Sequence, residues 1–374
     1  MICCMQIAPA VSLMDIRPLR LFLAGLAVLL SLFPLPVFPS EPQEIWDGLR
    51  LLPIEERQKQ LLSKAREEGG VVVYSTIETS VMQRLKLGFE QQHPGIKMII
   101  WRRPGDETAN RFMTEARAGR FAADVISPGM THGYALLRTG LIGRYSSPER
   151  TVYPDDHKDK EGHWTTISFK VAVMGINTKS VPASQAPRKY EDFFDRKWRG
   201  NFAIDMDSGR TLMAMLKMWG EEKTERFLQE LIKNEVVVRK GHTLITQLLC
   251  AGEFQAAVEL YASRVAEMKR KGCPVQLVYP DPWTPTGASF IMLARRAPHP
   301  YAAALLTDYL LSKIAQRILV DMGEFAGHPG IKSQYSDLDL EGKGVRVLTL
   351  RLEDTDVLGK KYLQLRERYL LGIG

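Results

Sequence analysis

Polar and charged side chains that could bind an anion recur at the ends of apolar segments in this 374-residue chain. The first of them stand in the polar loop 74–80, which follows the apolar run 71–73. Arginine forks suit the oxygens of carboxylates and phosphates, so several arginines brought together would bind an anionic group. We predict that the ligand-binding residues are Tyr74, Ser75, Thr76, Glu78, Arg102, Arg103, Ser127, Gly129, Ser208, Gly209, Arg210, Thr211, His242, Thr243 and Tyr261.

The segment 207–211 (DSGRT) is followed by an apolar helical pattern through Leu212, Met215 and Leu216. The predicted helix N-terminus is therefore free to receive an anion on its unpaired N–H groups. Each arginine taken alone could equally be an exposed surface charge, and the anion site rests on several of them converging.

Structural roles are also open to four of the aromatic and polar residues. Tyr74 could pack at the rim of a cleft or stack on a ligand, and Glu78 could accept hydrogen bonds within its own loop. We expect His242 to form hydrogen bonds rather than to bind a metal, because no second histidine stands nearby at a ligand spacing. Trp283, in a proline-rich loop, could be a lid contact or a structural plug.

The elements that must position these residues repeat the order strand, loop, helix. Buried strands are predicted at 71–73, 96–101 and 123–126, each followed by a polar loop and the first two by helical patterns. Ser80 followed by Gln83 predicts a capping box at the start of the first of these helices. Such units imply a parallel sheet with right-handed crossovers, so their loops gather along one edge.

A second group of elements follows the long apolar segment 165–179. Strands are predicted at 236–238, 254–261 and 275–279, with helices between them. Two α/β lobes joined by extended segments predict a hinged cleft that closes on a ligand.

The N-terminal segment 1–40 has the pattern of a secretory signal peptide. Arg17 and Arg20 precede an uncharged apolar stretch that is interrupted by prolines. An uncleaved membrane anchor is the alternative, because the stretch approaches the length of a membrane span. In an oxidising compartment Cys250 and Cys273 could form a bridge or remain two isolated buried thiols.

The composition is that of an ordinary globular protein, with 45% hydrophobic and 25% charged residues. The net charge is +7, but the basic residues are scattered, so we expect a solvated basic surface and no nucleic-acid partner.

Residues 69–325 resemble the periplasmic solute-binding proteins of ABC importers, in the ferric-binding, type II branch. The resemblance is carried by EGGVVVYST, AGRFAADVIS, YEDFFDRKWRGNFAI, GHTLITQLLCAGEFQAAV and APHPYAAALLTDYLLSKIAQRIL, in this order and spacing. It implies an α/β, two-lobed type II periplasmic binding protein fold with a hinged cleft. The expected organisation is a signal peptide (1–40), a lead-in helix (41–68), lobe 1 (69–167 plus 283–325), lobe 2 (168–282) and a C-terminal helical segment (326–374).

The same resemblance implies a monomeric periplasmic protein that delivers its cargo to a permease in the inner membrane. In iron-binding members a His or carboxylate, a second carboxylate and two adjacent tyrosines hold a ferric ion with an anion. Glu78 stands at the first position and Tyr261 one position before the tyrosine pair, which makes these two the candidate metal ligands. Gly129, near the second position, has no donor side chain. The expected cargo is a small anionic solute or a metal carried with an anion, including a ferric ion or chelate.

An exported two-lobe enzyme acting on a small anionic substrate is the alternative function. The sequence lacks a G-x-S-x-G elbow, a P-loop, an H-E-x-x-H helix and a G-x-G-x-x-G turn. Catalytic sites that arise by convergence need no such motif, so turnover of a candidate solute would be the discriminating observation. A sensor or chemoreceptor partner would use the same fold.

Overall fold

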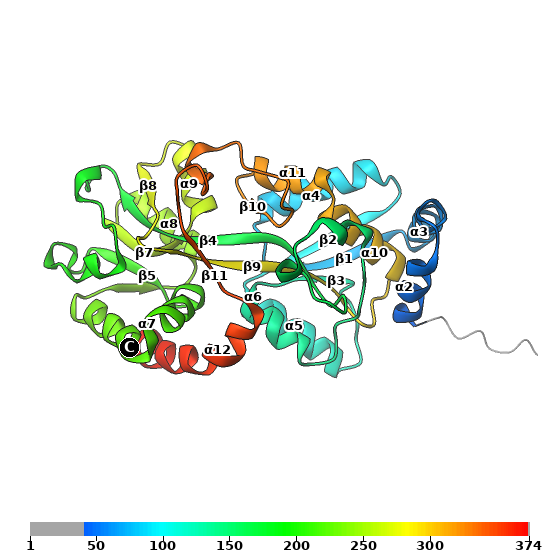
Figure 1. Cartoon of the computed structure of the whole chain (residues 1–374), viewed down its shortest axis with the longest axis horizontal. Coiled ribbons are helices and arrows are strands. Elements are labelled where there is room, and N and C mark those ends of the chain that lie inside the picture. Colours follow the sequence, from blue (N-terminus) through cyan, green and yellow to red (C-terminus); the bar gives the residue numbers. More distant parts are fainter. Residues whose placement is uncertain (1–40, 373–374) are drawn as a thin grey trace, which may run out of the picture. The chain divides into compact units, whose positions relative to one another are not determined.

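The computed structural model describes residues 41–372, and the predicted signal peptide (1–40) lies outside this part. Two helices, α2 (Pro42–Leu51) and α3 (Ile54–Glu68), open the described chain and pack on α10 (Pro300–Leu311). Trp46, Leu61 and other apolar residues on their inner faces are buried. The two helices thus form an outer layer against α10 (Figure 1).

The first group of strands is a parallel sheet in the order β2-β1-β3. The apolar run predicted as a buried strand lies in β1, where Val71 and Val73 are fully buried. We call this sheet and its helices lobe 1 (Figure 1). Its elements are β1 (Gly70–Ser75), α4 (Thr79–Gln92), β2 (Lys97–Arg102), α5 (Gly105–Arg117), β3 (Val125–Ser127), α6 (Met130–Leu137), α10 and α11 (Lys313–Asp321).

The second group of strands contains the parallel order β7-β5-β6. Its longest helix, α7, changes direction at Gly220, where φ is 80°. A glycine tolerates this left-handed conformation at little cost. We call this group lobe 2, with elements β5 (Phe202–Asp205), α7 (Gly209–Lys233), β6 (Val237–Arg239), α8 (His242–Ala251), β7 (Ala256–Tyr261), α9 (Ala262–Arg270) and β8 (Val275–Val278).

Two long antiparallel strands, β4 (Thr165–Asn177) and β9 (Thr284–Leu293), connect the lobes. The first half of β4 pairs with β9, and its second half pairs with β7 and β8 of lobe 2. β9 in turn pairs with β3 of lobe 1. Both strands are almost wholly buried, which agrees with the long apolar segment of the sequence. The fold is the two-lobed α/β arrangement that the sequence predicts.

The C-terminal part begins with β10 (Phe325–Ala326), which pairs with β4, and β11 (Val347–Thr349), which pairs with β9. It ends in helix α12 (Leu352–Arg366) and a π-helical turn, Glu367–Leu371. Short 3₁₀ helices lie at Pro148–Val152, Asp155–His157, Ala183–Gln185, Tyr190–Phe194, Arg196–Trp198 and Ser336–Leu338.

Two local features decide one question that the sequence leaves open and one prediction made from it. Cys250 and Cys273 form a disulfide between the end of α8 and the loop that precedes β8, with their Cα atoms 5.4 Å apart. The capping box predicted at Ser80 is wrong. Helix α4 begins at Thr79 with Glu78 as its N-cap residue, and no side chain caps it.

Candidate functional site

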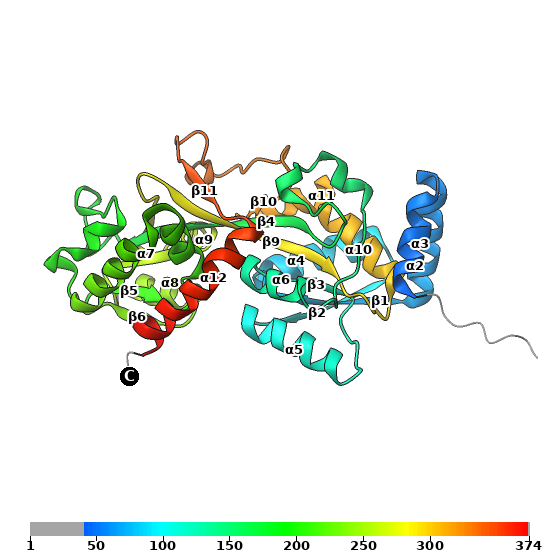
Figure 2. The ribbon, with the colours of Figure 1, turned by 60° about the horizontal axis from the view of Figure 1, so that its bottom comes forward.

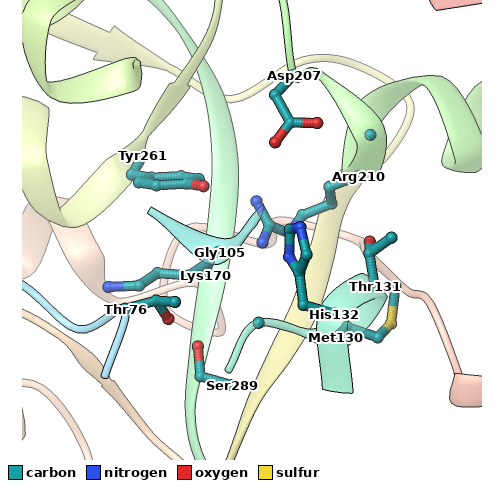
Figure 3. A pocket seen from close by; sticks show the side chains of 12 residues that line it. Thr76, Gly105, Met130, Thr131, His132, Lys170, Asp207, Arg210, Tyr261 and Ser289 are labelled. Atoms are coloured by element: carbon teal, nitrogen blue, oxygen red, sulfur yellow. The ribbon is translucent and has the colours of Figure 1, made fainter. Parts of the chain in front are cut away.

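A cavity of about 140 Å³ is lined by residues of both lobes and of the strands β4 and β9. Figure 3 shows the side chains of Arg210, Tyr261 and His132 directed into it. The lining residues are Thr76, Gly105, Gly129, Met130, Thr131, His132, Lys170, Asp207, Gly209, Arg210, Tyr261 and Ser289.

Three helices begin at the wall of this cavity. They are α5 at Gly105 and α6 at Met130 in lobe 1, and α7 at Gly209 in lobe 2. Among the described residues, no side chain caps the N-terminus of any of the three. The first N–H groups of a helix lack partners within the helix and carry the positive end of its dipole. These three N-termini therefore favour an anion in the cavity.

Arg210, in the first turn of α7, supplies a positive charge to the cavity. Its Nε atom is buried and has no hydrogen-bond partner among the described residues, and no ion pair engages the guanidinium in this part of the chain. The guanidinium carbon lies 5.2 Å from the centre of the Tyr261 ring. Gly287 of β9 leaves room for the side chain, because a Cβ atom there would lie 2.8 Å from Arg210 Nε. Arg210 is thus held in place with its donors available to a ligand.

Lys170 brings a second positive charge, from the middle of β4. Its ammonium lies 2.7 Å from a carboxylate oxygen of Glu324, and both side chains are nearly buried. The same ammonium lies 5.7 Å from the centre of the Tyr261 ring. Because Glu324 offsets the charge of Lys170, the free positive charge of the site comes mainly from Arg210.

Tyr261 forms one face of the cavity and is supported from behind by His242. The two rings are stacked, with centroids 4.1 Å apart and an angle of 12° between their planes. His242 Nδ1 lies 2.9 Å from Asp205, and Nε2 lies 3.4 Å from Glu259. His242 is therefore a buried support of the Tyr261 ring and does not line the cavity.

The two carboxylates determine the charge of His242. Burial is the largest effect and lowers the pKa of the imidazole, but Asp205, Tyr261 and Glu259 together outweigh it and raise that pKa well above its usual value. Burial is the largest effect on Asp205 and raises its pKa, but the charge and hydrogen bond of His242 and the backbone N–H groups of Asp207 and Gly241 together lower that pKa below its usual value. We conclude that a positively charged imidazolium lies under the aromatic wall at neutral pH.

Contacts between the lobes lie beside the cavity. Thr243 of lobe 2 donates a hydrogen bond of 2.8 Å to Glu78 of lobe 1. The guanidinium of Arg102 lies 3.7 Å from the same carboxylate. Lys240 of lobe 2 lies 3.6 Å from Asp106 of lobe 1. Glu78 thus binds across the cleft, which explains why it does not cap its own helix.

The candidate metal ligands Glu78 and Tyr261 line one small cavity next to the main one, together with Lys170. A metal ion there would lie close to a lysine ammonium, which opposes a bound cation. Within residues 41–372, no group of three or more His, Cys, Asp and Glu side chains is placed to hold a metal ion.

Three of the predicted ligand residues lie inside lobe 1. Tyr74 is buried and donates a hydrogen bond to Glu115, with its ring 5.0 Å from that of Trp101. The Ser75 hydroxyl accepts a hydrogen bond from the N–H of Ile77. The Ser127 hydroxyl is buried without a partner among the described residues. These side chains shape the loop that presents Thr76 to the cavity.

Three other predicted ligand residues lie behind α7 or at the surface. Ser208 is buried and donates to the carbonyl of Asp205, and Thr211 is buried on the inner face of α7. Arg103 has a side chain that is 56% exposed, near Glu107. Trp283 packs against Tyr190 and Trp219, which fits the role of a structural plug and not that of a lid contact.

Of the predicted residues, the main cavity brings together Thr76, Gly129, Gly209, Arg210 and Tyr261.

Seven lining residues are not among the predicted ones. Lys170 carries a signal in the sequence, since it is the one charged residue within the apolar segment 165–177. Asp207 directly precedes the predicted Ser208. The other five give no local signal, because only the packing of α5, α6 and β9 brings them to the cavity: Gly105, Met130, Thr131, His132 and Ser289.

His132 shows how closely the cavity wall is packed. A Cβ atom at Gly105 would overlap the His132 ring, so the glycine lets α5 approach α6. Burial lowers the pKa of His132 below its usual value, which keeps the imidazole neutral near pH 7. A neutral imidazole adds a hydrogen-bonding group to the cavity without adding charge.

Comparison with known proteins gives one family and a group of structures. Residues 121–340 match the profile of the family described as bacterial extracellular solute-binding protein. An uncharacterized protein of Haemophilus influenzae is 24% identical over 273 residues, which cover 70% of this chain and 78% of that protein. In the described residues, no helix combines the length and the apolar character needed to cross a membrane.

The similar solved structures share the fold at low sequence identity. Iron-bound HitA of Pseudomonas aeruginosa has a TM-score of 0.69 at 19% identity, with 80% of this chain and 99% of that chain covered. The ferric ion-binding protein A of Pasteurella haemolytica, in its apo form, has a TM-score of 0.69 at 20% identity, covering 80% and 98%. AfuA of Actinobacillus pleuropneumoniae, with fructose-6-phosphate bound, has a TM-score of 0.71 at 18% identity, covering 81% and 99%. Iron and a sugar phosphate are thus both seen bound to proteins with this fold.

Proposed function

The chain belongs to the bacterial extracellular solute-binding proteins, and on this premise we propose that it is the receptor of an ABC importer for a small anionic solute. It captures the solute between its two lobes and delivers it to a permease in the inner membrane. The protein acts in the periplasm, as a monomer, after export through residues 1–40. The disulfide Cys250–Cys273 fits an oxidising compartment of this kind.

The observation that carries the proposal is the guanidinium of Arg210, which has no ion-pair partner within residues 41–372 and lies in a cavity where three helices begin. Arginine offers a planar fork of donors that matches a carboxylate or phosphate group. The N-termini of α5 and α6 add N–H donors and partial positive charge from lobe 1, and that of α7 adds the same beside Arg210. An anionic group placed among them would satisfy donors that are otherwise unpaired.

The size of the cavity limits the solute. Pockets for drug-sized ligands measure roughly 300–1,000 Å³, whereas this cavity measures about 140 Å³. The hydroxyls of Thr131 and Ser289 can donate hydrogen bonds to the solute, whereas the Thr76 hydroxyl donates to the carbonyl of Ser127. A small organic or inorganic anion, or a metal carried as a compact anionic chelate, fits these properties.

A bare ferric ion fits the site less well. Asp207 is the one carboxylate among the residues that line the cavity, while Arg210 and Lys170 oppose a cation. Iron would therefore enter this site with an anion that supplies most of its oxygen ligands. The candidate ligands Glu78 and Tyr261 remain part of this proposal as groups that could contact such a complex.

The test is a thermal-shift screen of the exported protein, followed by titration calorimetry of each compound that binds. The panel contains phosphate, sugar phosphates, citrate and ferric citrate, with the corresponding neutral sugars as matched controls. A solute at 100 times its Kd stabilises the folded state by about 2.7 kcal/mol, which is readily detected. We expect stabilisation by an anion without turnover. Stabilisation by neutral or cationic solutes alone would contradict the proposal, and conversion of the solute would support the enzyme alternative.

A further inference from the structure

The C-terminal helix α12 lies beyond the family-matched residues 121–340 and contacts both lobes. It packs against α7 of lobe 2 along much of its length and against α6 of lobe 1. Figure 2 shows α12 running from beside α6 towards α7. We call α12 (Leu352–Arg366) the C-terminal strap.

The contacts of the strap with lobe 2 are buried and reach the cavity. Tyr362 is 2% exposed, and its hydroxyl donates a hydrogen bond of 2.6 Å to the cavity residue Asp207. Its ring also lies against Gly209, where a Cβ atom would be 3.0 Å from the ring. Arg366 Nε donates a hydrogen bond of 2.9 Å to the carbonyl of Met206. The strap therefore supports the segment that presents the N-terminus of α7.

Ion pairs extend this attachment to lobe 2. The ammonium of Lys217 on α7 lies 2.8 Å from Asp354. Beyond the strap, Arg368 lies 2.6 Å from Glu225, which also accepts a hydrogen bond of 2.8 Å from the Tyr369 hydroxyl. Buried tyrosine contacts and several charged contacts together fix the strap to this lobe.

The strap packs on α6 of lobe 1 and is joined to it by an exposed ion pair. Arg138, which follows the last residue of α6, pairs with Asp356 at 3.0 Å, and the two side chains are 66% and 57% exposed. An exposed pair of this kind forms and breaks at small cost. This ion pair is the part of the α12–α6 contact that a charge reversal can weaken without disturbing the buried contacts of the strap with α7.

We propose that the C-terminal strap moves with lobe 2 and docks on α6 when the cleft closes, so that it stabilises the closed form. Each of the two helices that meet in this contact is also linked to the cavity. Helix α6 begins at the cavity residue Met130, and Tyr362 of the strap donates a hydrogen bond to the cavity residue Asp207. The inference rests on the proposed capture of a solute between the lobes, since docking requires that the lobes move.

The test reverses one charge of the docking contact. In Asp356→Arg an arginine faces Arg138, which replaces attraction by repulsion in the closed form alone. We expect the ratio of open to closed molecules to rise about 2- to 10-fold, from the range of energies of exposed ion pairs. The double variant Arg138→Asp/Asp356→Arg restores the opposite charges and should return the ratio to that of the unchanged protein.

The matched control reverses an exposed pair within lobe 2. Glu235 lies 2.6 Å from Arg199, with both side chains about half exposed, and the pair does not join the lobes. Glu235→Arg should leave the ratio unchanged. The ratio is measured as a distance distribution by double electron–electron resonance, with spin labels on cysteines that replace the exposed Lys97 and Lys233.

The measurement is made on the exported protein without solute, so its result does not depend on whether an anion binds. A shift to longer distances in Asp356→Arg, with recovery in the charge swap, supports the proposal. An unchanged distribution in Asp356→Arg overturns it, and so does a shift of equal size in Glu235→Arg or a charge swap that fails to recover. Failure of the proposed function would instead appear as a lack of anion binding in the solute screen.

Discussion

Replacing Arg210 by alanine should weaken binding of the anionic solute while leaving the solute-free protein folded. The guanidinium has no ion pair within the described residues, and its Nε atom is buried without a partner. Hydrogen bonds to charged groups contribute about 1.5–3 kcal/mol each. Loss of one such contact corresponds to a Kd that is about 10- to 150-fold higher.

The stability of the solute-free variant should stay the same or rise slightly. Removing a partly buried charge that lacks a partner also removes its desolvation penalty. Urea unfolding measures the free energy of unfolding of the solute-free variant. Calorimetric titration with the anion identified by the solute screen measures the Kd.

Arg199→Ala is the matched control, because this exposed arginine pairs with Glu235 away from the cavity. We expect its Kd to match that of the unchanged protein. Equal affinity in Arg210→Ala, or an equal loss in both variants, would refute the assignment of Arg210 to the anion.

Three further outcomes are expected. The raised pKa of His242 stabilises the folded protein fully below the unfolded pKa of about 6.5. This contribution of His242 is lost as the pH rises towards its folded pKa, whereas the contribution of Asp205, whose pKa is lowered, is lost only in acid. The difference in free energy of unfolding between the unchanged protein and His242→Gln, measured in urea, should therefore be larger at pH 6 than at pH 9. A difference that grows with pH would contradict this account. Replacing Cys250 and Cys273 by serine should lower the free energy of unfolding by about 3 kcal/mol from chain entropy, again measured in urea, and unchanged stability would show that the bridge contributes little. A ferric salt without a chelator should leave the protein colourless, and a visible phenolate absorption band would instead identify Tyr261 as an iron ligand.

Much of the fold follows from short-range patterns in the sequence. The apolar run at 71–73, the segment 165–179 and the strand–loop–helix repeats correspond to β1, β4 and the parallel part of lobe 1. The start of α4 does not follow from its capping pattern. Ser80 and Gln83 fit a capping box, but Glu78 occupies the N-cap position and its carboxylate bonds to Thr243 of the other lobe. The sequence around Glu78 does not indicate a contact with a residue of the other lobe.

The candidate site is predictable only where the local pattern already determines the geometry. Arg210 and Gly209 lie at a helix N-terminus that the sequence shows, and Tyr261 ends a strand. His132 and Ser289 reach the cavity through the packing of helices and strands that are far apart in the chain. The periodicity of apolar residues in a segment shows which of its residues share a face. It does not show which faces of distant segments pack together.

The central claim is that the cleft carries a small anion, and native mass spectrometry tests it most directly. The protein is isolated from its own cell envelope under mild conditions and its bound mass is identified, alongside Arg210→Ala prepared in the same way. The account predicts a small anionic solute, alone or chelating a metal, on the unchanged protein and its loss from the variant. A ferric ion bound without an anion, or a neutral or cationic solute retained equally by both proteins, would contradict it.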